Sequence, residues 1–121
     1  MKIAILGASK NPERFAYLAL KGLIAQGHTL FPVNPALKEV EGIRCFKDLE
    51  SIPEKLDGIT VYLSPEKSAL YEAQILKAKP RFVIFNPGAE NPPLALLLKK
   101  GGIEVLETCS VTMLRLGTFP K

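Results

Sequence analysis

The stretch Lys2-Ile3-Ala4-Ile5-Leu6-Gly7-Ala8-Ser9-Lys10-Asn11-Pro12-Glu13-Arg14 decides the fold. Residues 2–6 form a short apolar run, which is typical of a strand buried on both faces. The run stops at Gly7, a small polar turn follows, and an amphipathic segment begins near Phe15. A buried strand, a tight turn and a helix start, in this order, present backbone N–H groups to a phosphate in open α/β proteins. The stretch therefore predicts an α/β fold whose first loop receives a phosphorylated ligand.

The rest of the chain repeats this alternation of strand and helix. Apolar runs predict further strands at residues 29–33, 58–63, 81–85 and 103–106, with a minor strand at 43–46 and at most a short helix near Ser51. Helices are predicted between Phe15 and Gly27, from Ser64 to Pro80, from Asn91 to Gly101 and from Thr108 to Leu116. Repeated βαβ units of this kind predict three layers, a mostly parallel five-stranded sheet with helices on both faces. Pro32 lacks an N–H and moves the second strand toward a sheet edge or an early end.

Helical spacing also predicts which side chains face the core. The predicted inward positions are Phe15, Leu18, Ala19, Gly22 and Leu23 in the first helix, and Ala69, Leu70, Ala73 and Leu76 in the helix after Ser64.

Composition bounds the class of protein. The chain has 121 residues, which predicts one domain over residues 1–121, and 47% apolar with 23% charged residues is ordinary for a soluble globular chain. The net charge is +4, but the sixteen Lys and Arg are scattered, which disfavours a nucleic-acid surface. No stretch approaches the roughly 20 apolar residues of a membrane helix. We therefore expect no membrane and no nucleic-acid partner. A homodimer is compatible with so small a domain, although no feature locates an interface.

The two cysteines point to a reducing compartment. Cys45 and Cys109 stand far apart without a CxxC partner, and His28 is the single histidine. A disulfide framework and a zinc site are both disfavoured by this pattern. We expect a cytoplasmic protein without a bound metal.

The turn after the first strand matches neither of two well-known phosphate motifs. The second and third glycines of GxGxxG are absent, and no Gly-Lys-Ser/Thr follows as in a Walker loop. Gly7-Ala8-Ser9 can still bring N–H groups to a ligand, and nearby side chains that can add donors or positive charge are Ser9, Lys10, Asn11 and Arg14. The alternative is a plain strand-to-helix turn with Pro12 at the first helical position.

Two later loops are further candidates. The second strand ends at Asn34-Pro35, with Lys38 nearby. An NAD site carries an acidic residue at this position to bind the ribose, so an amide with a nearby cation favours a phosphorylated ribose instead. The alternative is that Asn34-Pro35 is only a turn. The loop from Asn86 to Asn91 leads into a helix and can line a ligand groove or only cap that helix.

No catalytic set can be assembled from the sequence. Glu90 has no partner carboxylate or histidine nearby, His28 belongs to the opposite end of the sheet, and Cys109 is either a reactive thiol at a helix start or a buried structural cysteine. We therefore assign no catalytic residue, and a binding protein is favoured over an enzyme.

The chain resembles the small stand-alone CoA-binding proteins, which are similar to the nucleotide-binding domain of the succinyl-CoA synthetase alpha subunit and share its Rossmann-like fold. The resemblance spans nearly the whole chain. The matching segments are Gly7-Ala8-Ser9 with Pro12 and Arg14, Pro32-Val33-Asn34-Pro35, Gly42, Asp48-Leu49, Ile52-Pro53-Glu54, Asp57, Asn86-Pro87-Gly88-Ala89-Glu90-Asn91, Gly101-Gly102-Ile103-Glu104-Val105 and Cys109.

This resemblance implies a binding site for coenzyme A or an acyl-CoA. Gly7, Ala8, Ser9 and Arg14 would hold the diphosphate, while Asn34, Pro35 and Lys38 would lie near the adenosine and its 3′-phosphate. Ser64 and Pro65 would line the adenine or pantetheine side. With the neighbouring loop positions, the candidate cofactor-binding residues are Gly7, Ala8, Ser9, Lys10, Asn11, Pro12, Arg14, Asn34, Pro35, Lys38, Ser64, Pro65, Asn86, Pro87 and Gly88.

Three functions remain open from the sequence. The first is a non-catalytic module that binds CoA or an acyl-CoA. The second is an enzyme that processes CoA thioesters through Cys109 or Glu90. The third is an NAD(P)-type nucleotide binder, or an interaction module whose nucleotide site is vestigial.

Overall fold

The computed structural model describes all residues from 1 to 121. Its main sheet has five parallel strands in the order β2-β1-β5-β6-β7: β1 (Lys2–Leu6), β2 (Thr29–Val33), β5 (Gly58–Val61), β6 (Phe82–Phe85) and β7 (Glu104–Glu107). The predicted parallel five-stranded sheet is confirmed. Pro32 stands in the edge strand β2, where a residue without an N–H is tolerated.

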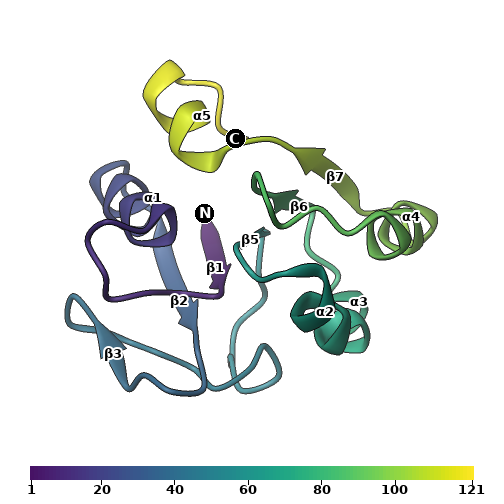
Figure 1. Cartoon of the computed structure of the whole chain (residues 1–121), viewed down its shortest axis with the longest axis horizontal. Coiled ribbons are helices and arrows are strands. Elements are labelled where there is room, and N and C mark those ends of the chain that lie inside the picture. The colour runs from purple at the N-terminus through teal and green to yellow at the C-terminus, as the bar shows by residue number, and fades with distance from the viewer.

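Helices cover both faces of the sheet, as Figure 1 shows. On one face lie α1 (Phe15–Ala25) and α5 (Ser110–Leu116), and on the other lie α2 (Pro65–Ser68), the 3₁₀ turn η1 (Ala69–Tyr71), α3 (Glu72–Ala78) and α4 (Pro92–Lys100). A separate antiparallel hairpin joins β3 (Glu39–Val40) to β4 (Ile43–Arg44). This is the predicted three-layer Rossmann-like fold. None of the helices is both long and apolar enough to span a bilayer.

The first strand feeds two cores. Ile3 and Ile5 pack with residues of α1 and α5, whereas Ala4 and Leu6 pack with residues of α3 and α4. All four side chains are fully buried. Alternate residues of a strand point to opposite faces, so an unbroken apolar run is what a strand covered on both sides requires.

The start of the first helix differs from the prediction. Pro12 precedes the helix, because Ser9 Oγ accepts a hydrogen bond from the Asn11 N–H at 3.0 Å and Asn11 Oδ1 accepts one from the Glu13 N–H at 3.0 Å. These local bonds hold the loop in turns and delay the helix until Phe15. Phe15 is 61% exposed instead of inward. The buried positions are Ala16, Ala19, Leu20 and Leu23.

The helical segment after β5 is broken, which the sequence did not predict. A 3₁₀ turn separates α2 from α3 and changes the angular phase of the side chains. Leu70, predicted to face inward, is 79% exposed, and Ile75 is the buried residue of α3. Ala69 and Ala73 are exposed as well.

No helix forms near Ser51. Asp48 Oδ1 accepts hydrogen bonds from the N–H and the hydroxyl of Ser51, at 2.9 and 2.6 Å, and closes a turn there. The segment for which at most a short helix was predicted is therefore a loop.

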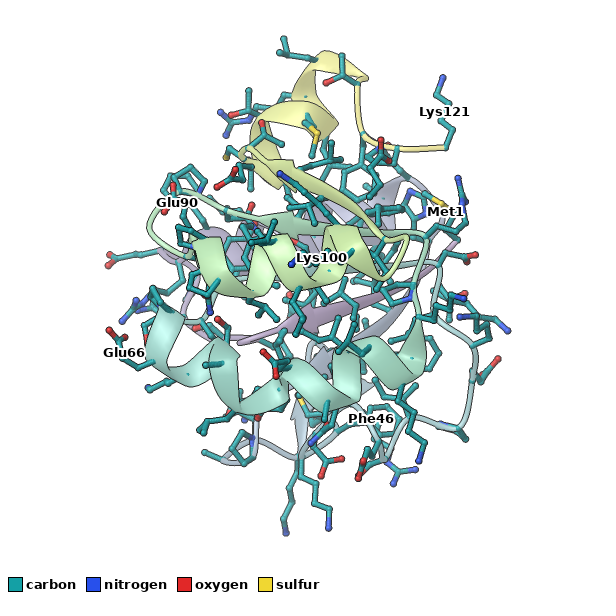
Figure 2. The ribbon with its side chains drawn as sticks, turned by 90° about the vertical axis from the view of Figure 1, so that its right-hand side faces the viewer. Met1, Phe46, Glu66, Glu90, Lys100 and Lys121 are labelled. Carbon is teal, nitrogen blue, oxygen red and sulfur yellow. The ribbon has the colours of Figure 1, made fainter.

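The strand order reverses between β1 and β5, because the chain passes from β1 to β2 on one side and continues with β5 on the other. Ligands of open α/β sheets bind at such a switch point, beyond the carboxyl ends of the strands. Figure 2 shows that Glu66 and Glu90, which follow β5 and β6, lie at one end of the sheet, opposite Met1 and Lys121. Loops from distant parts of the sequence thus gather at this end.

Candidate functional site

Two cavities meet at Gly7, at the switch point of the sheet. The α1 cavity has a volume of about 390 Å³ and is lined by Gly7, residues 14–16, Tyr62, residues 86–87 and Cys109. The η1 cavity has a volume of about 360 Å³ and is lined by Gly7, residues 33–35, Leu63, Lys67 and residues 70–71. A ligand that crosses Gly7 can occupy both.

Gly7 is required by the backbone. Its φ is +97°, and a Cβ placed there would stand 3.0 Å from Leu63 Cδ2 and 3.3 Å from Leu63 N. The N–H groups of Gly7 and Ala8 both donate to the Val33 carbonyl oxygen at 3.1 Å. These two groups therefore join the turn to β2 and are not free for a phosphate, in contrast to the prediction for them.

The free donors lie at the start of α1. Arg14 is the N-cap residue and makes no capping hydrogen bond with its side chain. The first N–H groups of a helix have no acceptor inside it, and those of Phe15 and Ala16 donate to no other group of the protein. Both residues line the α1 cavity together with Arg14. The positive end of a helix dipole and an exposed guanidinium thus meet at one cavity, an arrangement that favours an anion.

Asn34 braces the same turn from β2. Its Nδ2 donates to the Ala8 carbonyl oxygen at 2.8 Å, and its Oδ1 accepts from the Ala36 N–H at 2.8 Å. The side chain is thereby fixed between the two loops, and it lines the η1 cavity at the end of β2.

A basic hollow adjoins Asn34 on the hairpin side. Three cationic residues line it, namely Lys38, Arg44 and Lys47, and its volume is about 390 Å³. The Arg44 guanidinium carbon lies 4.8 Å from the centre of the Phe46 ring, which positions the charge by a cation–π contact. The hollow can accept an anionic group beyond the η1 cavity.

Asn86 is the centre of a buried hydrogen-bond network. Its Nδ2 donates to Thr60 Oγ1 at 2.7 Å and to the Val61 carbonyl oxygen at 2.9 Å, and its Oδ1 accepts from the Ser110 N–H at 2.8 Å. The Thr60 and Ser110 hydroxyl oxygens are 2.8 Å apart. This network ties β5, β6 and α5 together at the α1 cavity, which Asn86 itself lines.

Tyr62 follows β5 and enters the α1 cavity. Its buried hydroxyl has no hydrogen-bond partner. Burial is the largest influence on this group and raises the pKa of Tyr62 to about 12, although the nearby hydroxyls of Ser110 and Thr60 favour the ionised form. The phenol is therefore neutral at physiological pH.

Cys109 is the N-cap residue of α5 and a half-buried wall of the α1 cavity. Burial would raise the pKa of its thiol. Hydrogen bonds from Thr112 and Val111 and the charge of Arg115 outweigh that effect and hold the pKa of Cys109 below its usual value. Burial raises the pKa of the other thiol, Cys45. Of the two sequence interpretations, the structure favours the accessible thiol.

The predicted site residues separate into three groups. Gly7, Arg14, Asn86 and Pro87 line the α1 cavity, and Asn34, Pro35 and Lys38 line the η1 cavity or the basic hollow. Ala8, Ser9, Lys10, Asn11 and Pro12 form the connecting loop without lining either cavity. Ser64, Pro65 and Gly88 line neither cavity.

Several lining residues were missed from the sequence. They are Phe15, Ala16, Tyr62, Leu63, Lys67, Leu70 and Tyr71. Tyr62 and Leu63 were counted as strand interior, although β5 ends at Val61. The prediction of Ser64-Pro65 as a helix start could have revealed them, because residues between a strand end and the next helix lie at the ligand edge of a parallel sheet. No group of three or more His, Cys, Asp or Glu side chains could hold a metal ion.

Comparison with known proteins identifies a family. A family model described as a CoA binding domain matches residues 1–115. The uncharacterised protein YneT of Bacillus subtilis (strain 168) is 25% identical over 109 residues, which cover 89% of this chain and 81% of YneT. A crystal structure of an uncharacterised protein superposes with a TM-score of 0.91 at 40% identity and covers 98% of this chain and 97% of that chain.

One curated relative is a much larger protein. The alpha subunit of the ADP-forming acetate–CoA ligase II of Pyrococcus furiosus is 35% identical over 66 residues, which are 54% of this chain. The match spans only 14% of that subunit.

Proposed function

This chain belongs to the CoA binding domain family, and from that premise we propose that it binds coenzyme A or an acyl-CoA across the two cavities that meet at Gly7. The open N-terminus of α1 carries the proposal. Two N–H groups without acceptors, on Phe15 and Ala16, stand beside Arg14 in one cavity. A diphosphate is the part of CoA that such a helix terminus binds. The turn from Gly7 to Asn11 shapes the approach to this anion.

The adenosine half lies in the η1 cavity in this proposal. Leu63 and Tyr71 offer apolar walls to a base, and Lys67 stands at the same cavity. The 3′-phosphate reaches the basic hollow with Lys38 and Arg44. No acid follows β2 to accept the ribose hydroxyls of NAD, since Asn34 stands there and its side chain is already bonded to Ala8 and Ala36. These features favour CoA over a nicotinamide dinucleotide.

The proposal includes a single binding domain over residues 1–121, a location in the cytoplasm and no nucleic-acid partner. Two free cysteines and scattered basic residues support this assignment. The relative with a ligase name supports CoA as the class of ligand.

Equilibrium titration tests the proposal. Calorimetry with CoA, dephospho-CoA and NAD is expected to rank them in that order of affinity, because the basic hollow rewards the 3′-phosphate. Tighter binding of NAD than of CoA, or no CoA binding at millimolar concentration, would contradict it.

A CoA-thioester-processing enzyme is the second candidate, and Cys109 favours it. The thiol lines the α1 cavity. Burial alone would raise its pKa, but the nearby hydrogen bonds and the charge of Arg115 hold the pKa of Cys109 below its usual value. Glu90 is a weaker candidate, because its exposed carboxylate already accepts the Gly88 N–H at 2.8 Å. Hydrolysis or transfer of an acyl-CoA that is lost in Cys109→Ala would support the enzyme. Activity that survives both Cys109→Ala and Glu90→Gln would exclude these two residues as its source.

A further inference from the structure

Glu41 stands at the tip of the β3–β4 hairpin in a backbone conformation that glutamate rarely adopts. Its φ is +51°, and Gly42 follows with a φ of +78°. Two-residue hairpin turns with a positive φ at both positions favour Asn-Gly, Asp-Gly or Gly-Gly. Lys79 is the other residue besides glycine with a positive φ, and it is the C-cap of α3, where helices often use this conformation. Turn chemistry therefore does not account for a glutamate at position 41.

The side chain of Glu41 leaves the hairpin and contacts α1. Its Oε1 accepts a hydrogen bond from the Tyr17 hydroxyl at 2.6 Å and a second one from Lys21 Nζ at 3.0 Å. Tyr17 and Lys21 are four residues apart and therefore project from the same face of the helix. The hydrogen bond from Tyr17, followed by that from Lys21, lowers the pKa of Glu41, so the carboxylate is charged at neutral pH. One carboxylate oxygen thus joins the hairpin tip to α1.

The base of the hairpin is attached to β2 instead. The Phe46 N–H donates to the Pro32 carbonyl oxygen at 2.8 Å, and the Asn34 N–H donates to the Phe46 carbonyl oxygen at 2.9 Å. Between base and tip, the buried side chain of Val40 packs into the core that α1 covers. Apolar packing holds the hairpin against the molecule but is not directional, whereas the hydrogen bonds at the tip are.

The basic hollow lies between these attachments. Lys38 precedes β3, Arg44 belongs to β4 and Lys47 follows it, so the hairpin and its flanks carry the cations of the hollow. Glu41 is three residues from both Lys38 and Arg44. The anion position proposed for the diphosphate is at the start of α1, which is the helix that Glu41 contacts. The contact between Glu41 and α1 therefore links the two places where the proposed ligand carries negative charge.

We propose that Glu41 is a positioning residue that fixes the spacing between the basic hollow and the open N-terminus of α1, and that this spacing selects a 3′-phosphate over a 2′-phosphate on the ribose. The proposal rests on the proposed binding of CoA, whose ribose carries a 3′-phosphate. The two isomers have the same composition and charge, so a loosely held group of cations attracts both almost equally. Cations held in place discriminate between them, because only one isomer matches the fixed geometry.

The test measures binding of 3′-phospho-ADP and 2′-phospho-ADP by calorimetry, to the full chain and to its Glu41→Asp variant. The wild type is expected to prefer the 3′-isomer by about tenfold, the size of one hydrogen bond to a charged group. Aspartate keeps the charge and tolerates a positive φ, but its side chain is one methylene shorter and does not reach Tyr17 and Lys21. The preference should therefore fall to about threefold, a change that matches the loss of exposed contacts.

Two further variants sharpen the test. Tyr17→Phe removes the shorter hydrogen bond and leaves residue 41 unchanged, so the preference for the 3′-isomer should fall here as well. Glu54→Asp is the matched control, because Glu54 forms the other exposed ion pair, with Lys2 at the start of β1, and this variant should keep the wild-type preference. The melting temperature of unliganded Glu41→Asp should change by less than about 2 °C, since exposed contacts contribute little to stability.

The outcomes separate the positioning role from the proposed function. CoA binding by the wild type together with equal affinity for the two isomers would overturn the positioning role alone. An unchanged preference in Glu41→Asp, or an equal loss of affinity for both isomers, would also overturn it, because the contact would then not set the spacing. A preference that falls equally in Glu54→Asp would overturn it for the same reason. No CoA binding by the wild type would remove both the function and the positioning role.

Discussion

Two loops of this molecule look alike in sequence and differ in their chemistry. Residues 7–14 and residues 86–91 each follow a buried strand, contain glycine and proline, and lead into a helix. The first helix, α1, leaves the N–H groups of Phe15 and Ala16 without acceptors. The second helix, α4, opens with two prolines, which have no N–H groups. Asn91 accepts the next two N–H groups: its Oδ1 accepts from Leu94 at 3.2 Å, and its carbonyl oxygen accepts from Ala95 at 2.8 Å.

The side chains of the two loops repeat this difference. In the second loop, Asn86 is bonded to three residues and Glu90 accepts the Gly88 N–H at 2.8 Å. In the first loop, Arg14 makes neither a cap nor an ion pair. A ligand binds where polar groups remain without partners, and a loop that satisfies itself holds the fold. The difference between an open and a closed helix start is what the following predictions test.

Asn86→Ala is expected to have the largest effect, on stability. The variant loses three buried hydrogen bonds and leaves the Ser110 N–H unpaired, so the free energy of unfolding should fall by about 3 kcal/mol. Urea denaturation measures it. Ser9→Ala in the open loop is the control and should cost less than about 1 kcal/mol, because its bond to Asn11 is exposed. Equal losses in the two loops would refute the difference between them.

Ser9→Glu should act on binding instead. Ser9 lies in the loop between Gly7 and Arg14, two residues that line the α1 cavity. A carboxylate in this loop should repel the proposed diphosphate, so CoA affinity should fall by about 100-fold, which is about 2.7 kcal/mol. The free energy of unfolding should change by less than about 0.5 kcal/mol at this loop position. The matched control is Pro93→Glu, which places the same charge at the exposed start of α4. A stronger effect of Pro93→Glu in calorimetry would contradict the proposal, because the ligand would then bind near the loop that precedes α4.

Arg14→Gln should give a smaller loss of CoA affinity, about 5- to 10-fold, because one exposed charge–phosphate contact is removed. The loss should shrink as salt rises, since exposed charges are screened. Titrations at low and high salt measure both effects. Lys99→Gln removes one positive charge from the far end of α4 and should leave the affinity within twofold, so a similar loss there would mean that net charge alone attracts the ligand.

The smallest effect concerns the two thiols. The pKa of Cys109 is lowered and that of Cys45 is raised, so the thiolate of Cys109 forms at a lower pH than the thiolate of Cys45. Alkylation by iodoacetamide should therefore modify Cys109 first, with a rate that rises through a midpoint below that of Cys45. CoA should slow the reaction of Cys109 several-fold, because this thiol lines the α1 cavity. Protection of Cys45 instead would move the ligand out of that cavity.

Much of the fold could be predicted from local pattern. Strands β1, β2 and β6 stand within a residue of their predicted ranges, because apolar runs bounded by glycine or proline have few other folded uses. Phe15 and Leu70 were predicted to face inward and are exposed. Their orientation depends on where a helix starts and on the 3₁₀ turn at residues 69–71, which no periodicity reveals.

The site could be predicted only as a set of loops. The carboxyl ends of parallel strands share one edge, so the loops after Leu6, Val33 and Phe85 were expected to meet there. The sequence could not predict which N–H donors remain free. The N–H groups of Gly7 and Ala8 donate to the Val33 carbonyl oxygen, which belongs to another strand. Tyr62 was missed for the same reason: its unpaired hydroxyl is a property of its surroundings.

By itself, the sequence determined the order of strands and helices, the two-faced burial of β1 and the position of Pro32 at an edge. These follow from the side-chain period and from the missing N–H of proline, which are local. The tertiary structure alone decided that the first N–H groups of α1 have no acceptors, whereas Asn91 accepts those of Leu94 and Ala95 in α4. It also decided that Asn86 bonds Thr60 and Ser110 and that the buried Tyr62 hydroxyl has no hydrogen-bond partner. Hydrogen-bond satisfaction is a count over groups brought together by folding, and such a count does not exist along the chain.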